Sequence, residues 1–314
     1  MSLVLSIAAF LASLLLLYVG SKKIVNAAAC LADSLNFHKV VVGTVFVASV
    51  TSIPELLSSL IAVFFDSSQM ALGNILGSNI YNVPLIVGIC GLIGEYKLKN
   101  HAINRECILM IGSAVLLMVL VLATGMVAWW IGLIFLVLYL AFVYYSIRKG
   151  NGNGCPTDKP RESSKKSAAV MLLGGVALLC GTFLLVYSAI AMAEIFGLNM
   201  FYAGLTIMAL GCVVPETAVS VAAALHGEQE ISVGNVIGDN IITMTLVFGI
   251  VGLIRSFTVS ISEILSTAPF IILVTFMLYV MSWRSRKITK KWSLLMLTIA
   301  AVAFIFETFY FTFP

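Results

Sequence analysis

Charged residues are scarce in this sequence. Only 10% of its 314 residues are Asp, Glu, Lys or Arg and 61% are hydrophobic, against about 25% charged and about 45–50% apolar in soluble domains. This composition excludes an ordinary soluble enzyme and, despite the formal net charge of +4, does not indicate nucleic-acid binding. A membrane helix takes about 20 apolar residues. The chain therefore has room for about ten membrane-spanning helices, which we expect to be surrounded by the lipid bilayer.

Motifs of enzymes and of thiolate metal sites are also missing. The six cysteines form no CxxC pair and have no histidine at metal-ligand spacing. The sequence has no HExxH motif, no Ser-His or Cys-His catalytic arrangement and no nucleotide-binding loop. No basic segment precedes the first apolar run, so we expect a retained helix and not a signal peptide. We expect a protein that is not an enzyme and has neither a cofactor nor an obligate protein partner.

Ten apolar runs separated by polar residues predict an all-α polytopic membrane protein. The predicted helices cover residues 3–21, 38–64, 69–94, 104–124, 126–147, 167–195, 199–226, 230–254, 259–283 and 291–313. The one clearly hydrophilic segment divides the chain into two similar halves. We therefore predict a five-helix repeat over 1–147, a hydrophilic linker over 148–166 and a second five-helix repeat over 167–314.

The basic residues indicate the orientation of the chain. If the linker lies in the cytoplasm, ten spans place both termini outside, and 17 of the 18 Lys and Arg residues fall on the cytoplasmic side, with Arg255 as the exception. Cytoplasmic loops of membrane proteins carry an excess of Lys and Arg. We expect a multi-pass protein of the cell membrane with extracellular termini and a cytoplasmic linker.

The two halves contain an internal repeat. An offset of 161 residues aligns the segment starting at Gly43 with the segment starting at Gly204, without a gap. The matches include Pro54/Pro215, Glu55/Glu216, Gly73/Gly234, Asn74/Asn235, Gly77/Gly238 and Asn79/Asn240. Because each half has an odd number of spans, the second copy enters the membrane from the opposite face. Inverted repeats are typical of secondary transporters, whose substrate site lies near the bilayer midplane between the repeats.

Oxygen donors recur within this repeat. Glu55 and Glu216 each follow a proline inside an apolar span, where a carboxylate is costly unless it faces a cavity, a cation or a proton. Proline also leaves a backbone carbonyl one turn earlier without its donor. The further candidates are Asp239, the Asn82 amide, the hydroxyls of Thr51, Ser52, Ser78 and Thr243, and carbonyls near Ala48 and Ala209. Such hard oxygens favour Ca²⁺ or Na⁺ over transition metals or Mg²⁺.

The motifs SVTSIPELLSS and LGCVVPETAVS, each followed by a GN-rich segment (GNILGSNI and GNVIGDNI), resemble those of the cation/calcium exchanger superfamily. The resemblance covers the whole chain and is closest to the short prokaryotic sodium/calcium exchangers. It implies ten helices, exchange of Ca²⁺ for Na⁺ at one central site, and movement of the first and sixth helices. It makes Glu55 and Glu216 the central ligands. Further ligand positions are the carbonyls of Ala48, Thr51, Ala209 and Cys212 and the side chains of Ser52, Ser78 and Asn82.

The second repeat departs from the family pattern. Val213 stands where the sodium-coupled branch has a hydroxyl, Asp239 where it usually has Ser, and Thr243 where Asp is common. The number of carboxylates is unchanged, which preserves a Ca²⁺ site, but one oxygen of a Na⁺ site is lost. A Ca²⁺/H⁺ antiporter, whose glutamates carry protons in place of Na⁺, is therefore an alternative. A cation channel is a weaker one, because the inverted repeat disfavours it.

Overall fold

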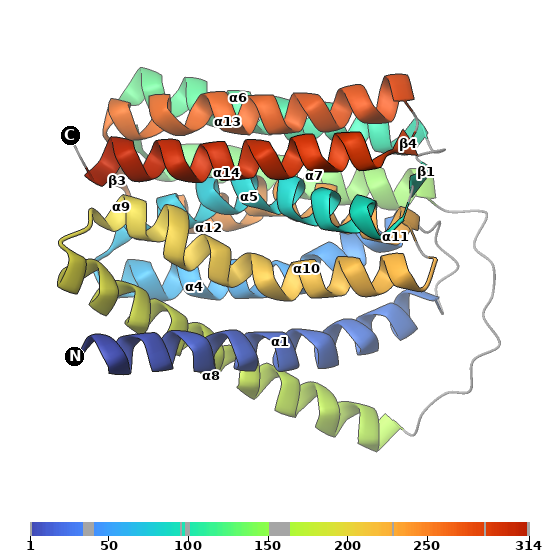
Figure 1. Ribbon diagram of the computed structural model, residues 1–314, viewed down its shortest axis with the longest axis horizontal. Helices are drawn as coiled ribbons and strands as arrows, with labels where there is room; N and C mark the ends of the chain where they lie inside the picture. The colour runs from blue at the N-terminus through green and yellow to red at the C-terminus, as the bar shows by residue number, and fades with distance from the viewer. Residues whose placement is uncertain are drawn as a thin grey trace.

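The protein is a bundle of long helices that run between two ends (Figure 1). The computed structural model describes residues 2–33, 41–94, 96–97, 101–150, 164–227, 229–285 and 287–312. Ten helical segments among these residues are long and apolar enough to cross a membrane. This confirms the predicted all-α membrane fold with ten spans.

Several of the spans combine more than one helical element, where η denotes a π-helical segment. In chain order the helices are α1 (Leu3–Asp33), η1 (Val42–Val47), α3 (Ala48–Thr51), α4 (Ile53–Phe64), α5 (Ser68–Ile93), α6 (His101–Thr124), α7 (Trp129–Gly150), α8 (Ser164–Phe196), α9 (Met200–Ala203), η2 (Gly204–Met208), α10 (Ala209–Leu225), α11 (Gln229–Ile242), η3 (Thr243–Val247), α12 (Phe248–Ile254), α13 (Ile261–Val280), η4 (Met281–Ser285) and α14 (Lys290–Thr312). The strands are β1 (Tyr96–Lys97), β2 (Met126–Val127), β3 (Phe257–Thr258) and β4 (Lys287–Ile288).

Three predicted boundaries differ from the structure. α1 continues to Asp33 and not to 21, because the segment after the two lysines contains alanine and other residues that a helix accepts. The fifth helix begins at Trp129 and not at 126, because Gly125 turns the chain at φ +67° and strand β2 follows. The linker predicted at 148–166 is helical at both of its ends, since α7 reaches Gly150 and α8 begins at Ser164. Its residues 151–163 lie outside the described part of the chain.

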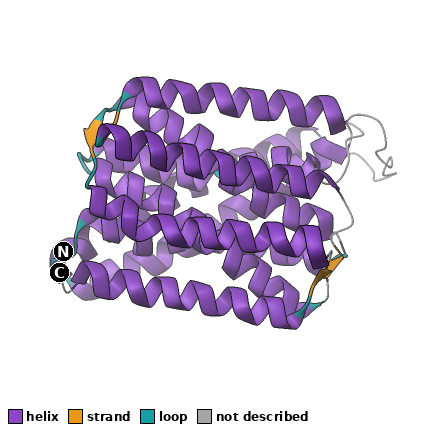
Figure 2. Cartoon of the chain, turned by 90° about the horizontal axis from the view of Figure 1, so that it is seen from above, coloured by secondary structure: helices purple, strands orange, loops and turns teal. Residues whose placement is uncertain are grey.

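Two short antiparallel ladders show that the halves are inverted. β1 pairs with β4 at one end of the bundle, and β2 pairs with β3 at the other (Figures 1 and 2). The 161-residue offset maps β1 onto β3 and β2 onto β4, so the repeat exchanges the two ends of the molecule. Both termini lie at the β2–β3 end, which we call the terminal end. The opposite end, where α7 finishes and α8 begins, is the linker end (Figure 1).

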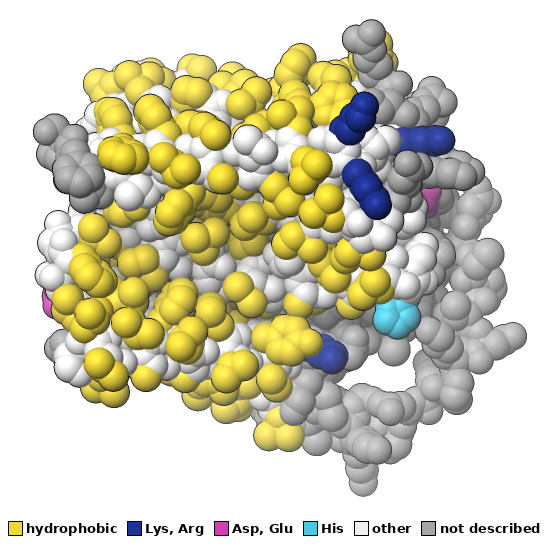
Figure 3. Space-filling model, in the orientation of Figure 1, with side chains coloured by type: hydrophobic (Ala, Val, Ile, Leu, Met, Phe, Trp, Pro, Cys, Tyr) yellow, Lys and Arg dark blue, Asp and Glu magenta, His cyan; other side chains and the backbone are white. Residues whose placement is uncertain are grey.

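Apolar side chains cover the outside of the bundle between its two ends. Large hydrophobic residues such as Val4, Leu15, Phe64 and Leu225 are more than half exposed, and the face in Figure 3 is largely hydrophobic, with its visible Lys and Arg side chains at the linker end. Soluble monomers rarely expose apolar patches of this extent. This surface belongs to a multi-pass membrane protein. α5 is buried along most of its length and forms the centre of the core.

Candidate functional site

Two close helix crossings bring the repeats together in the core. Gly77 of α5 lies against the Leu205 carbonyl of η2, and its repeat counterpart Gly238 of α11 lies against the Thr44 carbonyl of η1. A Cβ atom at either glycine would overlap the facing backbone. Glycine is therefore required for this approach. The polar residues that follow each glycine are held in the interior by these crossings.

Three acidic side chains meet inside the bundle. Glu55 on α4, Glu216 on α10 and Asp239 on α11 are all fully buried, and each contributes one carboxylate oxygen to a group in which every pair of oxygens lies within 4.8 Å. Like charges this close repel one another strongly in a medium of low dielectric constant. The cluster therefore requires a cation or protons to neutralise it.

The same Pro-Glu motif takes two local conformations. In the first repeat the helix is interrupted at Ser52, and Pro54 lies in the first turn of the new helix α4, a position where its missing N–H removes no helical bond. In the second repeat α10 continues through Pro215, so a helical hydrogen bond is lost there. The two glutamates thus approach the centre from different helical contexts.

Most of the predicted side-chain ligands carry oxygens without a protein partner. Both carboxylate oxygens of Glu55 and of Glu216, the hydroxyls of Ser78 and Thr243, and the amide oxygen of Asn82 are buried and accept or donate no hydrogen bond within the described residues. Buried polar atoms are nearly always hydrogen-bonded in folded proteins. A group of unpaired hard oxygens around three acids has the chemistry of a Ca²⁺ or Na⁺ site.

Asp239 differs from the two glutamates because it already has partners. It accepts hydrogen bonds from the Ser52 hydroxyl and from the amide nitrogen of Asn82. Asn82 also directs this nitrogen toward the Asn240 side-chain oxygen at 3.3 Å. The amide is thereby oriented with its nitrogen toward α11. These two bonds connect the first repeat, which contributes Ser52 and Asn82, to the acid of the second repeat.

The remaining predicted ligands are of two kinds. Thr51 and Ser52 make hydrogen bonds within the protein, and Ala48, Ala209 and Cys212 were predicted to contribute backbone carbonyls. The Thr51 hydroxyl lies 3.0 Å from the Asn235 side-chain oxygen and 3.2 Å from the Ala48 carbonyl, and it can donate its one proton to either. The Ser52 hydroxyl oxygen also lies 2.7 Å from the Ala48 carbonyl. Ala209 and Cys212 are fully buried on α10. All eleven predicted residues thus lie in the interior, although Thr51 and the Ala48 carbonyl have protein partners.

The repeat accounts for some of the unpaired oxygens. The Ser52 hydroxyl is hydrogen-bonded to Asp239. The repeat relates this pair to Val213 and Ser78. Because Val213 has no hydroxyl, the equivalent bond is absent, and the Ser78 hydroxyl has no partner among the described residues. The Thr51–Asn235 bond likewise corresponds to Cys212 and Asn74. The Cys212 sulfur instead lies 3.4 Å from the Ser58 hydroxyl. One half of the site is therefore closed by hydrogen bonds that the other half lacks.

Several buried polar residues were not identified as functional from the sequence. The Asn235 side-chain oxygen accepts a hydrogen bond from the Thr51 hydroxyl, and its side-chain nitrogen donates one to the Ser220 hydroxyl at 3.1 Å. The sequence signal for Asn235 was its repeat counterpart, Asn74. Glu106 on α6 and Glu307 on α14 are also fully buried, with both carboxylate oxygens free of hydrogen bonds in the described part of the molecule. Their only signal was an acid within an apolar run.

Comparisons with known proteins agree with this architecture. The family model described as "Sodium/calcium exchanger protein" matches residues 5–148 and 166–309. The sodium/calcium exchanger MaX1 of Methanosarcina acetivorans is 30% identical over 96% of this chain and 97% of its own length. The putative antiporter CaxA of Alkalimonas amylolytica is 34% identical over 76% of this chain and 78% of its own. Solved structures of the sodium-calcium exchanger NCX_Mj match with a TM-score of 0.74 and 24% identity, covering 97% of this chain and 99% of the other.

Proposed function

Because this chain belongs to the sodium/calcium exchanger protein family, a family of transporters and not of enzymes, we propose that it is a secondary antiporter that exchanges Ca²⁺ for Na⁺. The observation that carries the proposal is the buried group formed by Glu55, Glu216 and Asp239, with the unpaired oxygens around it. The transported ions are its substrates, and the mechanism needs no cofactor.

The proposed site uses the oxygens that lack protein partners. Ca²⁺ takes 6 to 8 oxygen ligands in a flexible shell. The glutamate carboxylates, Ser78, Asn82 and Thr243 supply side-chain oxygens, and carbonyls of the interrupted helices complete the set. Asp239, held by Ser52 and Asn82, provides fixed negative charge beside the ion.

Exchange follows from competition for one set of carboxylates. Bound Ca²⁺ neutralises Glu55 and Glu216, and Na⁺ or protons neutralise the same charges after Ca²⁺ leaves. Without any of these ions, the site would move across the membrane with uncompensated buried charge, which is strongly unfavourable. Reorientation of the empty site is therefore suppressed, and transport in one direction requires transport in the other.

We propose α1 and α8, the first and sixth spans, as the moving elements. They pack against each other along much of their length at the edge of the bundle (Figure 1). They cross at Gly20 and Gly181, which the 161-residue offset relates, and each glycine lies against the backbone of the other helix. Small residues let two membrane helices pack closely, so α1 and α8 would move together against the remaining helices.

Proton coupling is the second candidate, and one feature of the site favours it. Val213 is buried and apolar at the position related to Ser52, so the second repeat lacks one oxygen that a Na⁺ ion would use. Protons can neutralise a cluster of buried carboxylates in place of Na⁺. The same glutamates would then exchange Ca²⁺ for H⁺ by the same competition.

We further propose that the linker end faces the cytoplasm and the terminal end faces the outside of the cell. Lys and Arg residues lie mainly at the linker end, including Arg148 and Lys290 at the ends of α7 and α14. An excess of positive residues marks the cytoplasmic side. The protein would then occupy the cell membrane with its linker inside.

The experiment is uptake of radiolabelled Ca²⁺ into proteoliposomes loaded with Na⁺, or separately with an acidic interior. Wild type is compared with Glu55→Gln and Glu216→Gln, which preserve side-chain size while removing one negative charge. Loss of one carboxylate ligand is expected to reduce uptake by about 100-fold, equivalent to about 2.7 kcal/mol. Gel filtration of each variant verifies its folding.

Three outcomes separate the candidates. Uptake that requires an outward Na⁺ gradient and is lost in both variants supports Na⁺/Ca²⁺ exchange. Uptake driven by the pH gradient alone supports the proton-coupled alternative. Ca²⁺ uptake that needs no counter-ion gradient, or that survives both glutamine substitutions, contradicts the proposed mechanism.

A further inference from the structure

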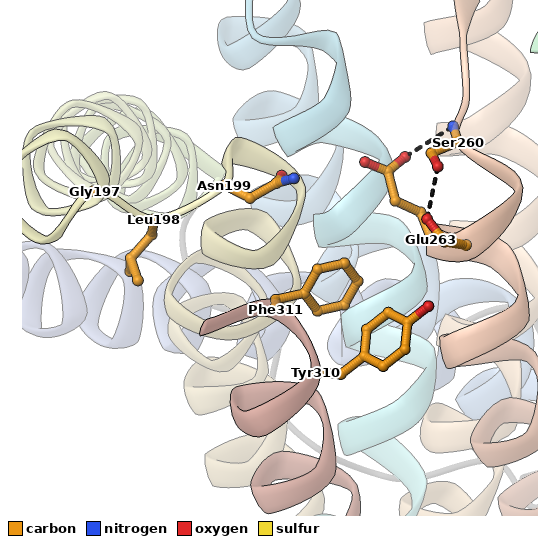
Figure 4. Close-up of a pocket in the computed structure, with 8 residues that line it drawn as sticks. Gly197, Leu198, Asn199, Ser260, Glu263, Tyr310 and Phe311 are labelled. Atoms are coloured by element: carbon orange, nitrogen blue, oxygen red, sulfur yellow. Dashed lines mark hydrogen bonds between the residues drawn. The ribbon is translucent and has the colours of Figure 1, made fainter. Parts of the chain in front are cut away.

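The two central glutamates are not held by hydrogen bonds of their own. Glu263 at the terminal end is an acid that is held in this way: its carboxylate accepts from the Ser260 backbone N–H at 3.2 Å, in the wall of a pocket of about 790 Å³ (Figure 4). The carboxylate oxygens of Glu55 and Glu216 have no such partner among the described residues. A functional site needs its groups placed to within about 0.5 Å. The position of each glutamate must therefore come from the helix that carries it.

An asparagine holds each of these two helices at the same place. The Asn74 side-chain nitrogen lies 3.0 Å from the Ser59 hydroxyl, and the Asn235 side-chain nitrogen lies 3.1 Å from the Ser220 hydroxyl. The 161-residue offset relates Asn74 to Asn235 and Ser59 to Ser220. All four side chains are buried. The same hydrogen bond thus occurs in both halves of the inverted repeat.

Each of these serines stands one helical turn after a glutamate. Ser59 follows Glu55 by four residues on α4, and Ser220 follows Glu216 by four residues on α10. Residues four apart lie on the same face of a helix. A hydrogen bond at the serine therefore restricts rotation of the helix about its axis, and with it the direction in which the glutamate points.

The backbone before each glutamate gives a weaker attachment. α4 begins only at Ile53, after the interruption at Ser52, and α10 loses a helical hydrogen bond at Pro215. The bond from the asparagine lies on the other side of the glutamate, where both helices are regular. It is the attachment that the two halves share, although their helices differ at the proline.

The asparagines lie on helices that are fixed in the core. Asn74 stands between Gly73 and Gly77 of α5, and a Cβ atom at either glycine would overlap a backbone carbonyl of α9 or η2. Asn235 stands three residues before Gly238 of α11, which makes the equivalent contact with η1. A side chain on a closely packed helix is a rigid point from which a second helix can be positioned.

The acceptors around each amide establish which way it points. The Asn74 nitrogen also lies 3.0 Å from the Ser58 hydroxyl and 3.4 Å from the Glu55 carbonyl. Because a backbone carbonyl only accepts hydrogen bonds, the nitrogen and not the oxygen of this amide faces α4. The Asn235 oxygen lies 3.0 Å from the Thr51 hydroxyl, which leaves its nitrogen for the serine of α10. Each asparagine is therefore the donor to its serine.

We propose that Asn74 and Asn235 are positioning residues, which hold Glu55 and Glu216 in the geometry that binds Ca²⁺ through the hydroxyls of Ser59 and Ser220. The asparagines and serines act on the ion only through the glutamates. This role rests on the proposed exchange, because the ion is the one proposed there.

The test uses Ser59→Ala and Ser220→Ala, which each remove one hydroxyl and leave the asparagine in place. Equilibrium binding of radiolabelled Ca²⁺ is measured on the purified protein, well below its melting temperature. The dissociation constant should rise about tenfold in each variant, at the low end of the loss caused by removing groups that support metal ligands. The carboxylate bands that Ca²⁺ shifts in the infrared spectrum should change as well. A loss of fold stability alone moves neither reading in folded protein.

Ser113→Ala on α6 is the matched control. The Ser113 hydroxyl is buried and donates to the Met110 carbonyl of its own helix at 3.0 Å, and it bonds no other helix within the described ranges. The substitution makes the same chemical change without removing a bond between helices. Its Ca²⁺ affinity and carboxylate bands should equal those of wild type.

A double-mutant cycle assigns the effect to the bond itself. Asn74→Ala is combined with Ser59→Ala, and Asn235→Ala with Ser220→Ala. If the hydrogen bond carries the effect, each double variant binds Ca²⁺ no more weakly than its asparagine variant alone. Should an asparagine variant fail to fold, the two serine variants and their control still decide the question.

The outcomes distinguish this role from the proposed function. Unchanged affinity in either serine variant overturns the positioning role in that repeat, and an equal loss in Ser113→Ala or additive losses in the cycles overturn it in both. In these cases Ca²⁺ binding by the wild type still supports exchange. A wild-type protein that binds no Ca²⁺ overturns the proposed function, and the positioning role with it.

Discussion

At the scale of single residues, the site is asymmetric. Asp239 is held by Ser52 and Asn82, whereas Glu55 and Glu216 have oxygens without partners. The repeats differ at all three positions of this arrangement, because the counterparts of Ser52, Asn82 and Asp239 are Val213, Thr243 and Ser78. In the proposed mechanism, the two glutamates with unpaired oxygens are the acids that exchange one ion for another.

Val213→Thr tests the role of this asymmetry. Threonine has nearly the shape of valine and adds a hydroxyl on the side of the site where Ser78 lacks a partner. One further oxygen ligand should strengthen competition by Na⁺ against Ca²⁺ about fivefold, or by about 1 kcal/mol. The measurement is the Na⁺ concentration that halves radiolabelled Ca²⁺ uptake.

Val213→Ala is the control, because it removes side-chain volume without adding an oxygen. An equal change in the two variants, or no change in Val213→Thr, would show that this position does not limit Na⁺ binding.

At the scale of helices, glycine crossings and helix interruptions set the geometry of the site. The spans and the repeat were predictable, because hydrophobic runs and recurring Pro, Glu, Gly and Asn are visible in the sequence. The break at Ser52 could not be predicted. Pro54 and Pro215 belong to the same Pro-Glu motif, and tertiary packing decides whether the helix is interrupted there or continues through the proline. Glu307 was missed because it has no acidic counterpart in the first repeat, where Ser146 takes its place.

Gly77→Ala and Gly238→Ala test the two crossings. Each added methyl group would overlap the carbonyl of the facing helix, and overpacking of this kind costs about 1–3 kcal/mol. We expect a lower apparent melting temperature in both variants, measured by the loss of the monodisperse peak after heating.

Gly112→Ala on α6 is the matched substitution, because no atom outside its own helix lies within 4 Å of the added Cβ. Alanine is about 1 kcal/mol better than glycine inside a helix, so this variant should be at least as stable as wild type. Equal destabilisation of all three variants would argue against the crossings.

At the scale of the whole molecule, inversion places equivalent features at opposite ends. The β1–β4 and β2–β3 ladders are related in this way, and so are Gly20 and Gly181 at the crossing of α1 and α8. A two-fold relation of this kind gives a central site similar approaches from either side of the membrane. This is the geometry that alternating access requires.

The orientation of the molecule can be tested with fusions. With the terminal end outside, alkaline phosphatase joined after Thr312 should be active in a bacterial host, because it folds only outside the cytoplasm. A green fluorescent protein at the same position should be dark when it is exported by the general secretory route. Fluorescence there, with an inactive phosphatase, would reverse the proposed orientation.

The central claim is that Glu55 and Glu216, beside the fixed charge of Asp239, bind the transported Ca²⁺. Equilibrium binding of radiolabelled Ca²⁺ to the purified protein tests it most directly, in the absence and presence of Na⁺ and at acidic pH. The account predicts saturable binding that Na⁺ or protons displace and that Glu55→Gln and Glu216→Gln each remove. Saturable binding that persists with both glutamates replaced would contradict it.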